Sequence, residues 1–289
     1  MSRRELAGNE TFERVSPEVG EFDEGAFDEA MAADPDAALG LLATLTAAVD
    51  ERLRARAREV ARTVIIAAAR SGAPRRGRPG RLVSAPLAPG GDLDVDAAVE
   101  ARVAAGGGIP AVEDLRVIEW ERPDLSLCLL VDRSGSMRGD ALATAAMAAA
   151  AVALRATGEH AVVAFANDVE VLRPMAPAAP APDGGAALVD AVLGLRGHGT
   201  TDVAAALLAC AQQLGRSRAG RRVGIVLSDC RSTEPGDVVA AAASVDELVI
   251  IAPRDDDAAA RELAAATGAR VATWAGPSEI PAVLRDVVG

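Results

Sequence analysis

The stretch LSLCLLVDRSGS, residues 125–136, changes from almost wholly apolar to polar within a few positions. Its first seven residues lack the regular polar alternation of a half-exposed strand, which predicts a strand buried on both faces of a parallel sheet. Asp132, Ser134 and Ser136 then offer one carboxylate and two hydroxyls, and Gly135 allows a tight turn between the hydroxyls. Open α/β sheets bind their ligands at such carboxyl ends of buried strands.

Strand-like and helix-like segments alternate from this stretch to the end of the chain. We expect strands at 125–131, 160–166, 169–172, 222–228, 247–252 and 270–274. The helical segments between them predict a doubly wound, mostly parallel α/β sheet with helices on both faces, which is a Rossmann-like architecture. In the strand order 3-2-1-4-5-6, the strands that end at Asp132 and Asp229 are neighbours.

The chain before this sheet is predicted to be mainly helical. Asp34 and Pro35 form a helix start, and apolar residues at helical spacing predict one helix from there to Arg70. Residues 73–81 contain only Ala, Pro, Arg and Gly and are interpreted as a linker. We divide the chain into an acidic, partly ordered segment at 1–33, a helical region at 34–110 and an α/β domain at 111–289 with its core at 124–289.

Composition excludes several classes of function. The formal net charge of the 289 residues is −12 and only 2% are aromatic, which argues against a nucleic-acid surface or a base-stacking platform. The sequence contains no lysine, so all 30 cationic residues are arginine. The chain therefore lacks the lysine that a P-loop ATPase or a Schiff-base enzyme requires.

We expect a cytoplasmic protein without a membrane span. Residues 1–15 lack the apolar segment of a secretory signal, and the apolar run at 141–154 is too short to cross a bilayer. Cys128, Cys210 and Cys230 show no CxxC spacing, which suits free thiols in a reducing compartment.

A third polar loop is expected to reach the same sheet edge. Thr201 follows a Gly-rich stretch and directly precedes a helix that leads into the strand ending at Asp229. The converging side chains are Asp132, Ser134, Ser136, Thr201 and Asp229. This shell of oxygen ligands with few negative charges favours Mg²⁺, or Mn²⁺, as the bound ion. Taken singly, each of these residues has a structural alternative: the aspartates as strand-end turn residues and the serines as helix caps.

The three loops together resemble the metal-ion-dependent adhesion site of von Willebrand factor type A (vWA) domains, in which Asp-x-Ser-x-Ser is followed by a distant Thr and a distant Asp. The resemblance covers about 124–289. It implies that Ser134 and Ser136 bind the metal directly, Thr201 directly or through water, and the two aspartates mostly through water. An open metal position would then take an Asp or Glu carboxylate from a partner protein. Cys230 departs from the pattern, because many relatives have Gly after the last Asp.

A narrower resemblance comes from GDLDVDA at 91–97 and EDLRV at 113–117, which are similar to magnesium-chelatase D-subunit-like and CoxE-like bacterial proteins. It implies a non-catalytic adaptor for a MoxR-type AAA+ ATPase, which must be a separate polypeptide because this chain has no Walker lysine. The main alternative is an accessory subunit of a metal chelatase that acts with a separate AAA+ subunit. An enzyme that uses Asp132 as phosphoryl acceptor and a metal-free scaffold also remain open.

Two further residues lie beside the predicted site. His198 either titrates next to the metal or is a solvated loop histidine. Cys230 is either a redox-sensitive thiol or an inert, packed side chain.

Overall fold

The structure is a computed structural model that describes residues 3–6, 9–70, 81–87, 92–121, 125–135, 139–155, 159–176, 185–197 and 199–288. The chain forms two compact units. The larger unit comprises Met1–Pro74 and Leu125–Gly289, and the smaller unit comprises Arg75–Asp124.

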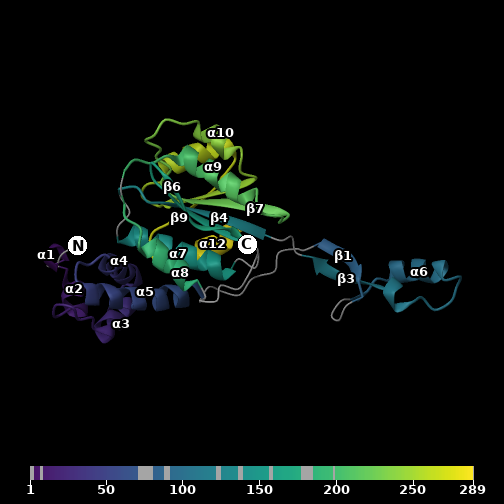
Figure 1. The fold of residues 1–289 in the computed structure, drawn as a ribbon, viewed down its shortest axis with the longest axis horizontal. Coiled ribbons are helices and arrows are strands. Elements are labelled where there is room, and N and C mark those ends of the chain that lie inside the picture. Colours follow the sequence, from purple (N-terminus) through teal and green to yellow (C-terminus); the bar gives the residue numbers. More distant parts are fainter. Residues whose placement is uncertain are drawn as a thin grey trace. The chain divides into compact units, whose positions relative to one another are not determined.

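A six-stranded sheet in the order β6-β5-β4-β7-β8-β9 forms the centre of the larger unit (Figure 1). Its strands are β4 (Leu125–Asp132), β5 (His160–Phe165), β6 (Val169–Ala176), β7 (Arg221–Leu227), β8 (Glu247–Pro253) and β9 (Arg270–Trp274). The edge strand β6 is antiparallel to β5, and all the other pairings are parallel. The predicted fold class and strand order are therefore confirmed, with β4 and β7 as direct neighbours.

Helices cover both faces of this sheet (Figure 1). They are α7 (Asp140–Arg155), α8 (Ala186–Leu193), α9 (Val203–Leu214), α10 (Val238–Ala242), α11 (Ala258–Thr267) and α12 (Ile280–Val288), the last preceded by the 3-10 turn η2 (Pro277–Glu279). Successive residues of β4 point to opposite faces: Leu129 packs in the cluster that includes α7, α8 and α12, and Leu130 packs in the cluster that includes α9, α10 and α11. This two-sided burial explains why β4 has no polar alternation.

The N-terminal helices add a further layer against α7 and α8. They are α1 (Arg3–Leu6), α2 (Glu10–Val15), α3 (Glu24–Ala33), α4 (Pro35–Leu45) and α5 (Glu51–Arg70). Phe12 and Phe27 are buried in the same apolar cluster as α7, so the 1–33 segment contributes to the core of the larger unit.

The prediction of one helix from Pro35 to Arg70 is wrong, because α4 and α5 are separate helices. The chain leaves α4 at Thr46, whose hydroxyl donates to Ala43 O at 2.6 Å. Asp50 then accepts the N–H of Leu53 at 2.8 Å and so caps the start of α5. Val49, which lies at helical spacing from Leu45 and Leu53, is exposed in this connection.

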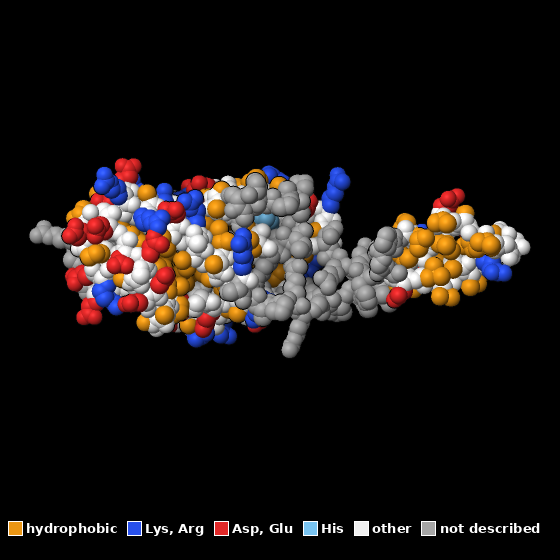
Figure 2. All heavy atoms as spheres, turned by 90° about the horizontal axis from the view of Figure 1, so that it is seen from below, with side chains coloured by type: hydrophobic (Ala, Val, Ile, Leu, Met, Phe, Trp, Pro, Cys, Tyr) orange, Lys and Arg blue, Asp and Glu red, His pale blue; other side chains and the backbone are white. Residues whose placement is uncertain are grey.

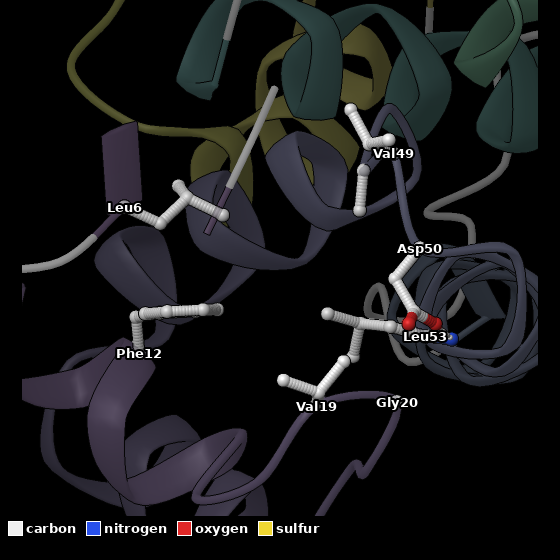
Figure 3. Close-up of a pocket in the computed structure, with 8 residues that line it drawn as sticks. Leu6, Phe12, Val19, Gly20, Val49, Asp50 and Leu53 are labelled. Atoms are coloured by element: carbon white, nitrogen blue, oxygen red, sulfur yellow. Dashed lines mark hydrogen bonds between the residues drawn. The ribbon is translucent and has the colours of Figure 1, made fainter. Parts of the chain in front are cut away.

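A small cavity lies among the N-terminal elements (Figure 3). Its volume is about 30 Å³, and Leu6, Phe12, Val19 and Leu53 are among the side chains that line it. The cavity is mostly apolar and far too small for an organic ligand, so we interpret it as a packing defect.

The smaller unit contains a three-stranded antiparallel sheet in the order β1-β3-β2. Its elements are β1 (Arg81–Pro86), β2 (Asp92–Leu93), α6 (Val95–Ala104), the 3-10 turn η1 (Val112–Asp114) and β3 (Arg116–Glu121). β3 pairs antiparallel with both β1 and β2, so these three strands form a sheet of their own. The predicted boundaries at 33/34 and 110/111 stay predictions, and the predicted linker at 73–81 lies, except for Arg81, outside the described residues.

Helix α6 presents an apolar stripe to solvent. Val95, Val99 and Val103 are spaced four residues apart and are 63%, 56% and 73% exposed. Apolar side chains dominate the visible surface of this unit in Figure 2. No residue of α6 is buried.

None of the helices in the described part of the chain combines the length and the apolar character needed to cross a bilayer.

Candidate functional site

Asp132 ends β4 at the edge where the neighbouring strands β5 and β7 also end. Only 8% of the residue is exposed. Its Oδ1 accepts the backbone N–H of Ser134 at 2.8 Å, and its Oδ2 accepts the hydroxyl of Ser228 at 2.6 Å. Both carboxylate oxygens therefore have fixed positions, one held by its own loop and one by the end of β7.

The loop after β7 carries Asp229 at the same edge. Ser228 donates its hydroxyl to Asp132 and accepts the N–H of Cys230 at 2.9 Å, so it links β4 to this loop. Asp229 Oδ1 accepts the N–H of Arg231 at 2.9 Å, which closes a short turn. Cys230 lies inside that turn with a φ of 62°, a left-handed conformation that glycine adopts at no steric cost. A glycine would adopt this backbone conformation without the steric cost that the Cβ of Cys230 carries.

The third loop carries Thr201, which is buried just before α9. Its N–H donates to Thr233 Oγ1 at 2.8 Å, and its carbonyl accepts the N–H of Thr233 at 2.9 Å. Asp202 caps α9 by accepting the N–H of Ala205 at 2.9 Å. The Thr201 loop is therefore tied to the segment that follows Asp229.

These contacts bring together four of the five predicted residues, in three loops that touch one another. Asp132 and Ser134 share a hydrogen bond, Ser228 connects Asp132 to the Asp229 loop, and Thr233 connects that loop to Thr201. The fifth residue, Ser136, lies outside the described residues, as does His198.

The electrostatics of the site favour a cation. Burial, and to a lesser degree the nearby charge of Asp229, raises the pKa of Asp132, while hydrogen bonds from Ser228 and Ser134 partly oppose the shift. Within the described residues, neither aspartate forms an ion pair with an arginine. Two carboxylates at adjacent strand ends without a basic partner, together with hydroxyl groups, fit a hard divalent cation.

The donor set is one of oxygens. No group of three or more His, Cys, Asp or Glu side chains in the described part of the chain is arranged to hold a metal, so any metal here would depend on hydroxyls and water. Burial and the charges of Asp229 and Asp132 raise the pKa of the Cys230 thiol to about 12. A buried thiol that stays protonated is neither a ready metal ligand nor a reactive nucleophile, which favours the interpretation of Cys230 as packed and inert.

Sequence reasoning missed two contributors to the site. Ser228 directly precedes Asp229, and a hydroxyl at the end of a buried strand was a usable signal. Arg133 lies within the first loop, and its guanidinium donates to Asp168 Oδ2 at 2.7 Å. The sequence gives no sign that Arg133 and Asp168 are paired, because they are 35 positions apart and meet only through the β4–β5 pairing.

Residues 57–278 match the family described as "VWA domain containing CoxE-like protein". This match covers more than half of the chain. The chain belongs to this family. Domains of the vWA type are generally interaction modules, which assigns the chain to that broad class. No curated protein matches the chain.

Solved structures similar to this chain include a von Willebrand factor type A protein from Catenulispora acidiphila, at 21% identity and a TM-score of 0.47. That match covers 60% of this chain and 43% of the other, so it spans less than half of that protein's length. The conserved hypothetical protein BatB from Bacteroides thetaiotaomicron is similar at 13% identity and a TM-score of 0.46, over 57% of this chain and 97% of its own.

Proposed function

We propose that the protein is a metal-dependent protein-binding module. Asp132, Ser134, Ser136, Thr201 and Asp229 would hold one Mg²⁺ or Mn²⁺. The observation that carries this proposal is that Asp132 and Asp229 lie at adjacent strand ends, are connected through Ser228 and have no basic partner among the described residues. The bound ion would supply a Lewis-acidic position for an oxygen ligand from outside the chain.

The partner group that this site suits is an Asp or Glu carboxylate. Hydroxyl ligands do not neutralise a divalent cation, so the ion would keep positive charge toward an anionic ligand. The chain itself has a net charge of −12, so an acidic partner surface would be repelled without such an ion. The narrower expectation is an adaptor for a separate MoxR-type AAA+ ATPase, with the chelatase accessory subunit as its alternative.

Metal binding is tested by isothermal titration of the purified chain with MgCl₂ and MnCl₂. We expect one site in the native protein and a loss of binding of at least tenfold in Asp132→Ala, because that change removes a carboxylate of the proposed site and the acceptor of two hydrogen bonds. Asp246→Ala is the matched control, since Asp246 forms an exposed ion pair with Arg222 next to the amino ends of β7 and β8. Native protein that binds neither ion would refute the proposal.

Partner binding is tested with a purified MoxR-type ATPase. We expect co-elution in Mg²⁺ that is lost with EDTA and in Asp132→Ala, but retained in Asp246→Ala. Co-elution that is unchanged by EDTA and by Asp132→Ala would refute metal-dependent binding, but it would still support an adaptor role. To test the chelatase alternative, a chelatase catalytic subunit and a porphyrin are added to the same mixture. Metal insertion into the porphyrin that requires this chain would support that alternative.

A further inference from the structure

Arg133 connects the first loop of the site to the β5–β6 turn. It lies between the proposed ligands Asp132 and Ser134. Its backbone N–H donates to Phe165 O at 2.7 Å, and its guanidinium Nη2 donates to Asp168 Oδ2 at 2.7 Å. The loop is therefore attached at both its backbone and a side chain.

The same turn also contacts the Thr201 loop. Asp202, directly after Thr201, donates its N–H to Ala166 O at 2.8 Å. Gly199 lies so close to Asn167 that a Cβ at position 199 would come within 2.8 Å of Asn167 Oδ1. The β5–β6 turn, residues 166–168, thus contacts two of the three ligand-bearing loops.

The charge of Arg133 also matters. Its side chain is only 8% exposed, so water screens the guanidinium poorly. An unneutralised guanidinium between two metal ligands would repel a divalent cation. Asp168 supplies the compensating charge, and Glu170 lies 3.9 Å from the same nitrogen.

We propose that Arg133 and Asp168 are positioning residues for the metal site. Their ion pair fixes the Asp132–Ser134 loop against the β5–β6 turn, and it neutralises a buried positive charge next to the ion. This inference rests on the proposed function, since it concerns the same site.

The test compares Asp168→Asn with Asp246→Asn in the full chain. Each change removes the carboxylate of an exposed aspartate that pairs with an arginine. Asp246, however, lies next to the amino end of the sheet, away from the site. We expect the Kd for Mg²⁺ and Mn²⁺ to rise about tenfold or more in Asp168→Asn, the size typical of losing a residue that supports a metal site from outside the ligand set, and to stay within about twofold in Asp246→Asn. The circular dichroism spectrum without metal should be the same in both variants.

The double variant Arg133→Gln/Asp168→Asn separates charge from structure. It restores neutrality, so we expect it to recover part of the affinity lost in Asp168→Asn, which a purely structural role would not produce. The electron paramagnetic resonance spectrum of bound Mn²⁺ should broaden or shift in Asp168→Asn and not in Asp246→Asn.

The outcomes are distinguishable. If the native chain binds metal and Asp168→Asn binds it within about twofold of the native Kd, this inference is overturned and the proposed function stands. Absence of recovery in the double variant would overturn the neutralising role. If the native chain binds no metal, the proposed function and this inference both fall.

Discussion

At the scale of single residues, Cys230 is the clearest conflict between a side chain and its backbone. Its φ of 62° lies in the left-handed region, which costs a residue with a Cβ roughly 1–2 kcal/mol. Hydrogen bonds from the N–H of Cys230 to Ser228 and from the N–H of Arg231 to Asp229 hold this turn in place. Strain of this kind persists where the surrounding contacts fix the backbone.

We therefore expect Cys230→Gly to be more stable than Cys230→Ala by about 0.5–1 kcal/mol. Both variants lose the sulfur, which packs in the cluster beneath α9, but only glycine relieves the left-handed strain. Urea unfolding of the two variants, followed by circular dichroism, measures the difference. Alanine that is as stable as glycine would show that the turn relaxes to a different backbone conformation when the sulfur is removed.

At the scale of elements, the contact between β7 and α9 depends on a missing side chain. Gly224 pairs with Cys128 across the parallel β4–β7 ladder. A Cβ at Gly224 would lie 2.8 Å from Cys210 Sγ and 2.9 Å from Val245 Cγ1. Cys210 is fully buried on α9, so the helix approaches the sheet closely only because position 224 lacks a side chain.

Gly224→Ala is expected to lower the free energy of unfolding by about 1–3 kcal/mol, because overpacking forces the helix or the strand to shift. Gly220→Ala is the matched control: no atom lies within 4 Å of its Cβ, so we expect it to be neutral or slightly stabilising. Chemical denaturation of both variants at pH 7 measures the effect. Equal stability of the two would mean that the sheet and helix adjust without cost.

At the scale of the whole molecule, Glu247 joins three strands and the end of the chain. It accepts two hydrogen bonds from Arg221, at 2.7 and 2.6 Å, and it also pairs with Arg270. Arg221 donates in turn to Val288 O at 3.0 Å, and Arg270 donates to Val287 O at 2.6 Å. Cations at the last carbonyls of α12 are also favourable for the helix dipole.

These arginines lower the pKa of Glu247, with the hydrogen bond from Arg221 as the largest cause. The native state then binds a proton at this carboxyl less readily than the unfolded chain does. The resulting stability is present above the usual pKa of Glu, about 4.3, and is lost as the pH falls through the lower native value.

Glu247→Gln is therefore expected to lower the free energy of unfolding by about 1 kcal/mol at pH 7, a modest value because the group is partly exposed. The difference from the native protein should shrink as the pH falls below about 4. Denaturation curves from pH 7 to pH 3 measure it, with Asp246→Asn as the control for a more exposed pair. A difference that stays constant over this range would assign the effect to packing instead of charge.

Local patterns were sufficient to predict the α/β class and the strand order. The unbroken apolar run of β4, the alternation of strands and helices, and the two aspartates at strand ends are all visible within short windows of sequence. Because parallel strands end at the same edge, the meeting of Asp132 and Asp229 followed from the order alone. The break between α4 and α5 was missed because one apolar spacing continues across it, although Asp50 is a recognisable cap.

Tertiary structure alone decided which residues hold the loops. The contacts of Ser228 with Asp132, of Arg133 with Asp168 and of Thr201 with Thr233 each join positions at least 32 residues apart. The pairing of β3 with β1 in a separate sheet likewise joins segments that are far apart in the sequence. Local periodicity reports which face of an element is buried, but it carries no information on which distant side chain completes a hydrogen bond, because that depends on how the packed elements bring their loops together.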